Sequence, residues 1–102
     1  MKFAKVEMSN SDVMEINYNG INPTKDQFEA YLKEVIDMVE QNPGAAQLYD
    51  GTNIKLLPAD LRIRHGKWIK ENEGILSQNV TVTAIIIPNM LARMVMRGIF
   101  LI

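Results

Sequence analysis

The sequence predicts an α/β domain with a mixed, mainly parallel sheet, and three features support that prediction. The run from Val80 to Ile87 is apolar and rich in β-branched residues, as is typical of a buried strand. Two earlier segments, residues 24–42 and 58–76, carry apolar residues at helical spacing. Strands separated by helices need crossover connections, which produce parallel pairs. We therefore expect the order β-β-α-β-α-β-α in a single domain spanning residues 1–102.

The first part of the chain is expected to hold a hairpin and the clearest helix. Alternation in residues 2–8 and 13–18, on either side of a Ser-Asn-Ser-Asp turn, predicts two antiparallel strands. Thr24 and Gln27 have the spacing of a capping box, which marks the start of a helix. Its apolar stripe comprises Phe28, Tyr31, Leu32, Val35, Ile36 and Val39. The Asn-Pro-Gly sequence at residues 42–44 should end this helix.

The later elements are expected to follow as strand, helix, strand and helix. Residues 45–49 should form a short strand, and Pro58 suits the first turn of the second helix. The inward stripe of that helix is expected to comprise Leu61, His65, Trp68, Ile69, Asn72, Ile75 and Leu76. The run at residues 80–87 would then be the central strand of the sheet. Pro88 should end it, because proline cannot donate to a sheet ladder, and Asn89 is a good N-cap for a last helix.

Composition argues against several classes of function. A net charge of −1 disfavours non-specific nucleic-acid binding, which needs a basic surface, and without cysteine the chain has no disulfide or thiolate metal site. The longest apolar stretch, residues 84–102, is interrupted by Pro88, Arg93 and Arg97. An arginine at the centre of a membrane span costs about 2.5–3.5 kcal/mol, so we expect no membrane span. The opening MKFAKVEM does not fit a signal peptide, so we expect a cytoplasmic location.

Polar residues follow two of the expected strands, at the sheet edge where α/β domains bind ligands. Asp50, Thr52 and Asn53 follow the strand at residues 45–49, and Asn89 follows the last strand. Nearby positive charge comes from Lys55, Arg62 and Arg64. An anion could bind at this edge, but turn and capping roles for these residues are the favoured interpretation. The candidate ligand or partner loop therefore comprises Asp50, Thr52, Asn53, Lys55 and Asn89.

His65 is the only histidine, and we expect it to be a half-buried structural residue beside Trp68. A catalytic base needs a nucleophile and an orienting partner, and a metal site needs further ligands. The sequence offers neither set, so we expect no enzymatic activity, no metal and no cofactor.

The last stretch, Met90 to Ile102, is apolar on every side. A surface helix needs one face in water, so more than its own sheet should cover this one. A truncated domain, a docked terminus and an interface with another molecule would each explain the pattern. We favour contact with a second copy of the chain, giving a homodimer. The expected interface residues are Met90, Met94, Ile99, Phe100, Leu101 and Ile102.

These patterns resemble the STAS domain, the fold of anti-sigma factor antagonists. The likeness lies in an opening hairpin, alternating helices and short strands, and an aspartate at a strand end in LYDGT. A closer likeness is to the bacterial STAS-like (SpoIIAA-like) proteins of unassigned function, over about residues 45–102. It is carried by Tyr49-Asp50-Gly51, Trp68-Ile69, and the stretch from Ile87-Pro88-Asn89 through Arg97-Gly98-Ile99-Phe100. The resemblance implies a non-enzymatic module that acts through protein–protein contacts, with a regulatory role.

The chain also departs from that family. Its antagonists carry a phosphorylatable serine where this chain reads Leu57-Pro58-Ala59-Asp60, so Thr52 is the only nearby substitute. The family continues past the equivalent of Ile102 into another strand and helix, which this chain would lack. Such folds also resemble small lipid-binding domains, so binding of a lipid or another apolar ligand is the alternative function.

Overall fold

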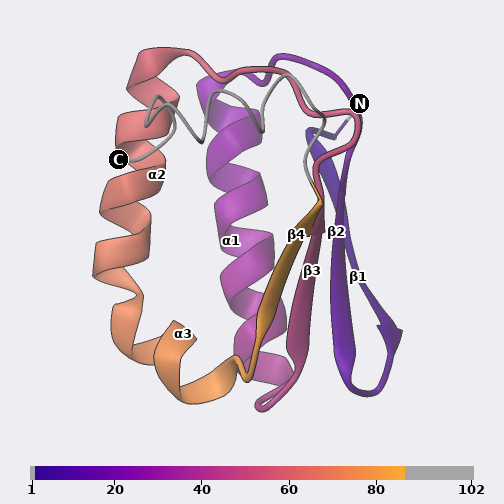
Figure 1. Cartoon of the computed structure of the whole chain (residues 1–102). Helices are drawn as coiled ribbons and strands as arrows, with labels where there is room; N and C mark the ends of the chain where they lie inside the picture. The colour runs from indigo at the N-terminus through magenta and orange to yellow at the C-terminus, as the bar shows by residue number, and fades with distance from the viewer. Residues whose placement is uncertain (1, 87–102) are drawn as a thin grey trace.

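The computed structural model describes residues 2–86, in which strands and helices alternate around one four-stranded sheet (Figure 1). The elements are β1 (Ala4–Asn10), β2 (Val13–Tyr18), α1 (Lys25–Gln41), β3 (Ala46–Asp50), α2 (Ala59–Glu71), α3 (Glu73–Asn79) and β4 (Thr83–Ile86). The strand order is β1-β2-β3-β4, with β1 and β2 antiparallel and the other neighbours parallel. The prediction of an α/β fold with a mixed, mainly parallel sheet is confirmed.

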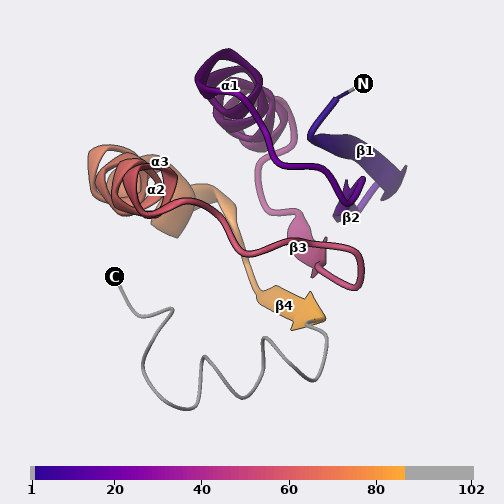
Figure 2. The same cartoon turned by 90° about the horizontal axis from the view of Figure 1, so that it is seen from above.

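All three helices lie on the same side of the sheet (Figure 2). Strand register explains which side chains they cover: Val6 pairs with Ile16 and Met8 with Met14, so the hairpin presents one apolar face to α1. On the opposite face Glu7 pairs with Glu15. The core therefore lies between the hairpin and α1, where Met14 and Ile16 are fully buried.

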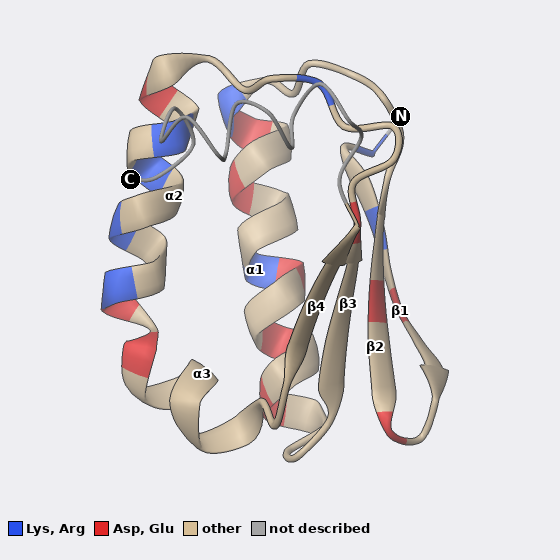
Figure 3. Cartoon of the chain, in the orientation of Figure 1, with Lys and Arg blue, Asp and Glu red and all other residues tan. Residues whose placement is uncertain are grey.

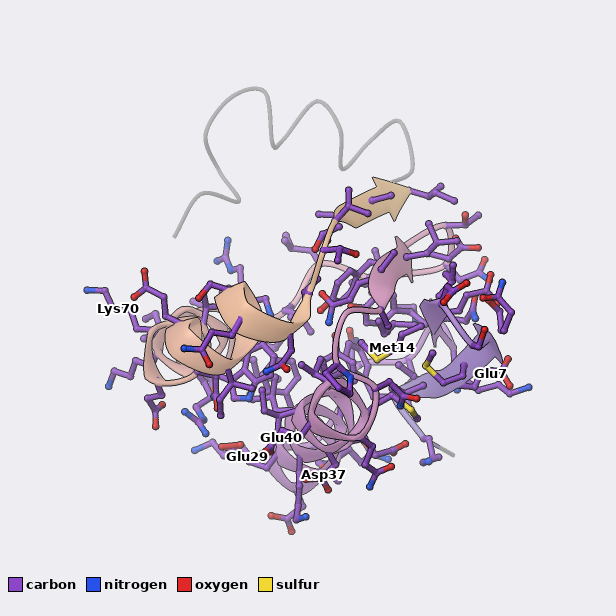
Figure 4. The ribbon with its side chains drawn as sticks, turned by 90° about the horizontal axis from the view of Figure 1, so that it is seen from below. Glu7, Met14, Glu29, Asp37, Glu40 and Lys70 are labelled. Carbon is purple, nitrogen blue, oxygen red and sulfur yellow. The ribbon has the colours of Figure 1, made fainter. Side chains whose placement is uncertain are left out.

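Helix α1 follows its predicted pattern closely. Its capping box is present, since the Gln27 backbone N–H donates to Thr24 Oγ1 at 3.1 Å and the Thr24 N–H donates to Gln27 Oε1 at 2.8 Å. The predicted stripe is buried except for Ile36, which is partly buried. Viewed along the helix, Glu29, Asp37 and Glu40 lie on its outer side, while Met14 lies between the sheet and α1 (Figure 4). The amphipathic pattern thus fixes how α1 docks on the sheet.

The second predicted helix is divided in two at Asn72. This residue ends α2 and precedes α3, and its backbone N–H donates to the Trp68 carbonyl at 3.0 Å. Leu61 and Trp68 are buried as predicted, but Ile69 is 44 % exposed. Ile69 directly follows Trp68 and so points about 100° further round the helix, away from the buried side.

The prediction of a central strand at residues 80–87 is wrong within the described residues. Val80 belongs to the end of α3, where its N–H donates to the Leu76 carbonyl at 3.0 Å, and β4 begins only at Thr83. In residues 2–86, β4 pairs with β3 alone and forms the edge of the sheet. Ile85 is 65 % exposed. The error arose because an apolar, β-branched run indicates a strand whose side chains favour burial, but it does not indicate how many other strands pair with that strand.

The expected last helix, its N-cap Asn89 and the expected dimer interface at residues 90–102 lie outside the described residues. Among the helices of residues 2–86, none combines the length and apolar character needed to cross a bilayer.

Candidate functional site

A cavity of about 760 Å³, open to solvent on one side where Val82 and Ile85 are exposed, lies between the sheet and the helical layer formed by α2 and α3. Aromatic side chains from the hairpin and α1 border it: Phe3, Tyr18, Phe28 and Tyr31. Aliphatic and aromatic side chains from the loop before α2 and from the helices complete much of the wall: Ile54, Leu57, Trp68, Leu76 and Val80. The cavity is therefore mainly apolar, with a few polar side chains among its walls.

The position of α2 accounts for this space. Helix α2 packs mainly on α1 and α3 rather than on the sheet, and it stands apart from β3 and β4 (Figure 2). Arg64 joins α2 to α1, since its Nε donates to Glu29 Oε1 at 2.6 Å, while its Nη1 donates to Glu71 Oε1 within α2 at 2.7 Å. The side chains of α2 that face the sheet consequently border a cavity instead of filling a core.

Charged residues are most numerous on α1 and α2, and β4 carries none (Figure 3). From Gly74 to Ile86 the chain has no Lys, Arg, Asp or Glu. This uncharged segment forms the wall of the cavity at α3 and β4. Among the described residues that line the cavity, Arg62 and Glu73 carry the formal charges.

The three tyrosines of the chain all border the cavity and are held in their neutral form. The hydroxyl oxygens of Tyr18 and Tyr31 are 2.6 Å apart, and the Phe3 ring packs against both tyrosine rings at centroid distances of 5.2 and 5.1 Å. Burial raises the pKa of Tyr18 and of Tyr31 well above the ordinary value of 10.0. Burial also raises the pKa of Tyr49 to about 12. These hydroxyls can donate or accept hydrogen bonds, but they do not ionise near neutral pH.

His65 is half-buried, as expected, and stacks on Trp68 with ring centroids 5.8 Å apart and planes 14° apart. The Phe28 ring contacts it edge-on at a centroid distance of 6.3 Å. Desolvation by burial lowers the pKa of His65 below its ordinary value of 6.5, so the imidazole is neutral at pH 7. The residue therefore contributes an aromatic surface to the cavity wall.

Two polar side chains in the walls have donors without partners. Gln47 on β3 is 5 % exposed, and its Nε2 makes no hydrogen bond of good geometry among the described residues, although the Gln47 side chain lies close enough to the Tyr49 hydroxyl to offset part of the rise in the Tyr49 pKa. Its Oε1 lies 3.4 Å from Thr83 Oγ1, which donates to it. Arg62 on α2 has a buried Nε that likewise lacks a partner in residues 2–86. Sequence reasoning missed Gln47, although a glutamine within a short apolar strand was a readable signal of a buried polar group.

The predicted loop lies beside the cavity, and its polar groups serve the turn. Asp50 Oδ1 accepts from the Thr52 N–H at 3.0 Å and from Thr52 Oγ1 at 2.5 Å, and these hydrogen bonds lower the pKa of Asp50. Thr52, Asn53 and Lys55 are exposed. The Asn53 carbonyl approaches Gly20, where an added Cβ would lie 3.2 Å from that oxygen. The structure thus brings Asp50 and Thr52 together as turn residues.

Among residues 2–86, no group of three or more histidines or carboxylates is placed to hold a metal ion. Comparison of the chain with protein-family models, curated proteins and solved structures finds no match. The resemblance to STAS-like proteins thus has no support from relatives, and function must be argued from the geometry of the site.

Proposed function

We propose that the protein is a non-catalytic binding domain that holds a small apolar molecule in the cavity between the sheet and the layer of α2 and α3. The observation that carries this proposal is the cavity itself, about 760 Å³ in volume and walled mainly by apolar side chains. Ligand pockets typically measure roughly 300–1,000 Å³ and combine such walls with a few polar groups. Each Å² of apolar surface that a ligand removes from water contributes about 25 cal/mol, so the walls supply binding free energy.

The titratable groups around the cavity support binding without chemistry. A general acid or base works best when its pKa lies near the operating pH. Burial moves the pKa of Tyr49 up to about 12 and the pKa of His65 downward, so both stay in one protonation state near neutrality. The proposed role is accordingly retention or transport of the ligand.

The test uses the single tryptophan of the chain, Trp68, which lines the cavity and reports on its occupant. The full chain is titrated with N-phenyl-1-naphthylamine, whose emission rises in apolar surroundings, and the dye is then displaced with 1-decanol. Dye binding at micromolar concentration, displacement by decanol and a change in Trp68 emission are expected. Absence of all three would overturn the proposal.

A matched pair of variants on β4 locates the binding site. Thr83 pairs with Gln47 and lines the cavity, whereas Ala84 pairs with Leu48 and points to the other face of the sheet. Thr83→Phe adds a ring inside the cavity and should weaken dye binding at least about tenfold, a loss of about 1.4 kcal/mol. Ala84→Phe adds the same ring outside it and should leave binding unchanged. Equal effects of the two substitutions would place the dye elsewhere.

A second candidate function is a STAS-like module acting through protein–protein contacts, which we propose to operate in the cytoplasm as a homodimer. The observation that favours it is the open edge of β4 in the described residues, where Ile85 is 65 % exposed and Val82, just before the strand, is 60 % exposed. An exposed edge strand offers unpaired backbone groups to another chain. Sedimentation velocity at micromolar concentration should show a dimer, and Ile86→Lys should convert it to a monomer. A monomeric native chain would contradict this role.

A further inference from the structure

The cavity places two unsatisfied donors at its two ends. Helix α2 begins at the same end of the molecule as the carboxyl end of β3, and the end of α3 lies beside the amino end of β3, where the Gly44 N–H donates to the Asn79 carbonyl at 2.6 Å (Figure 1). Arg62 lies in the first turns of α2, whereas Gln47 is the second residue of β3. Strand rise is about 3.3 Å per residue, so Gln47 lies about 10 Å from the end of β3 at Asp50. The apolar walls extend between these two polar positions.

Neither donor is explained by the fold. Gln47 is 5 % exposed with its Nε2 unpartnered among the described residues, and the Nε of Arg62 is also buried without a partner there. Both side chains line the same cavity. Buried donors are normally satisfied, because leaving one unpaired forfeits the hydrogen bond it made to water. A ligand that brings an acceptor to each donor would restore both hydrogen bonds.

The charges along the cavity give the ligand a direction. Arg62 is the cationic residue among the described lining residues, and Glu73, at the start of α3, is the acidic one. A carboxylate would be attracted to the guanidinium and repelled from Glu73, while an uncharged acceptor carries no such penalty. The anionic end of a ligand thus belongs at the α2 end of the cavity.

We propose that the ligand is an elongated apolar monocarboxylate whose carboxylate binds Arg62 and whose far end carries a neutral acceptor for the Nε2 of Gln47. This inference rests on the proposed function, since it names the class of molecule that the cavity takes. An ω-hydroxylated medium-chain acid has the required groups: one carboxylate, an apolar body and a hydroxyl oxygen at the other end.

The test compares three probes that share a ten-carbon body: 1-decanol, decanoate and 10-hydroxydecanoate. Their affinities for the full chain are measured by displacement of N-phenyl-1-naphthylamine and by Trp68 emission. Decanoate should bind about tenfold or more tightly than decanol, because it gains a charge-assisted hydrogen bond at Arg62. The added hydroxyl should tighten binding again, about threefold or more, through Gln47.

Variants assign each gain to its residue. Arg62→Met should remove the preference for decanoate and leave decanol binding intact, whereas Lys70→Met removes the same charge from the outer side of α2 and should keep the preference (Figure 4). Gln47→Met should remove only the gain from the terminal hydroxyl. This inference is overturned if all three probes bind with no preference for decanoate, or if the preference persists in Arg62→Met. Either result would still support an apolar binding site. Failure of every probe to bind overturns the proposed function itself.

Discussion

The hydroxyl groups of Tyr18 on β2 and Tyr31 on α1 form a hydrogen bond of 2.6 Å between the hairpin and the first helix. Both rings also pack against Phe3, whose centroid lies 5.1 Å from that of Tyr31 in an edge-on arrangement. Because this contact joins two elements at the wall of the cavity, it couples the stability of the fold to the shape of the site.

The first prediction concerns alkaline pH. Unfolded tyrosines ionise at about pH 10, whereas burial raises the pKa of Tyr49 to about 12 and the pKa of Tyr31 further. The folded chain thus binds more protons than the unfolded chain above pH 10, and its free energy of unfolding should fall as pH rises. Urea denaturation between pH 9 and about 11.5 should show the fall, and Tyr31→Phe should make it shallower. Tyrosinate absorbance appearing near pH 10 in the folded chain would contradict the prediction.

The second prediction concerns acid pH. Burial lowers the pKa of His65 below 6.5, so the unfolded chain takes up a proton at a higher pH than the folded chain. The stability that comes from neutral His65 is present above pH 6.5 and is lost as pH falls through the lowered pKa. His65→Phe should reduce this loss while keeping the contact with Trp68. A proton NMR titration of the single histidine checks it, and a midpoint at or above 6.5 would be the wrong sign.

The third prediction concerns Gln47 in the absence of ligand. Its unpartnered Nε2 costs about 1–3 kcal/mol of stability, so Gln47→Met should raise the free energy of unfolding by about 1 kcal/mol. Gln78→Met, at an exposed position of α3, serves as the matched control and should change stability by less than about 0.5 kcal/mol. Chemical denaturation measures both. Destabilisation by Gln47→Met would show that the amide is satisfied in the folded chain.

The fourth prediction concerns the start of α1. Thr24→Ala removes the side chain that accepts from the Gln27 N–H, and should lower stability by about 1 kcal/mol. Thr24→Ser keeps the acceptor oxygen and should retain most of that stability. Thermal and urea unfolding compare the three proteins, and equal losses in the alanine and serine variants would argue against capping as the cause.

The fifth prediction concerns the loop after β3. The Thr52 side chain is exposed, donates to Asp50 within the turn and is not among the described residues that line the cavity. Thr52→Glu should therefore change neither dye binding nor the sedimentation of the chain. A change in dye affinity of more than about tenfold, or 1.4 kcal/mol, or a change of oligomeric state in sedimentation, would identify this loop as a switch.

Elements defined by local sequence were predicted well. The capping box at Thr24 and the stripe of α1 need only residues three or four positions apart, so their pattern is legible in the chain. The position of β4 in the sheet could not be predicted from its own residues, because that position depends on which other strands pair with β4. The chain written as TVTAII fits a central strand or an edge strand equally well.

The cavity could not be predicted for a related reason. It exists because α2 stands away from the sheet, and that position involves the contact between Arg64 and Glu29, which are 35 residues apart in the sequence. Side chains that looked like a helix's buried stripe, such as His65, consequently border a cavity. Gln47 could have been predicted from the sequence, since it lies two residues from Tyr49 and so on the same face of β3.

The contact between Arg64 and Glu29 also bears on two properties of the cavity, its width and the polar groups that line it, which different residues control. Neither residue is among the described lining of the cavity, yet their contact joins α2 to α1, the helix beside which α2 stands. Replacing Glu29 with the shorter aspartate should therefore adjust the width of the cavity without changing which polar side chains, Gln47 and Arg62, line it. The size of ligand that the cavity accepts and the chemical groups that it prefers can thus change separately, by natural mutation or by engineering.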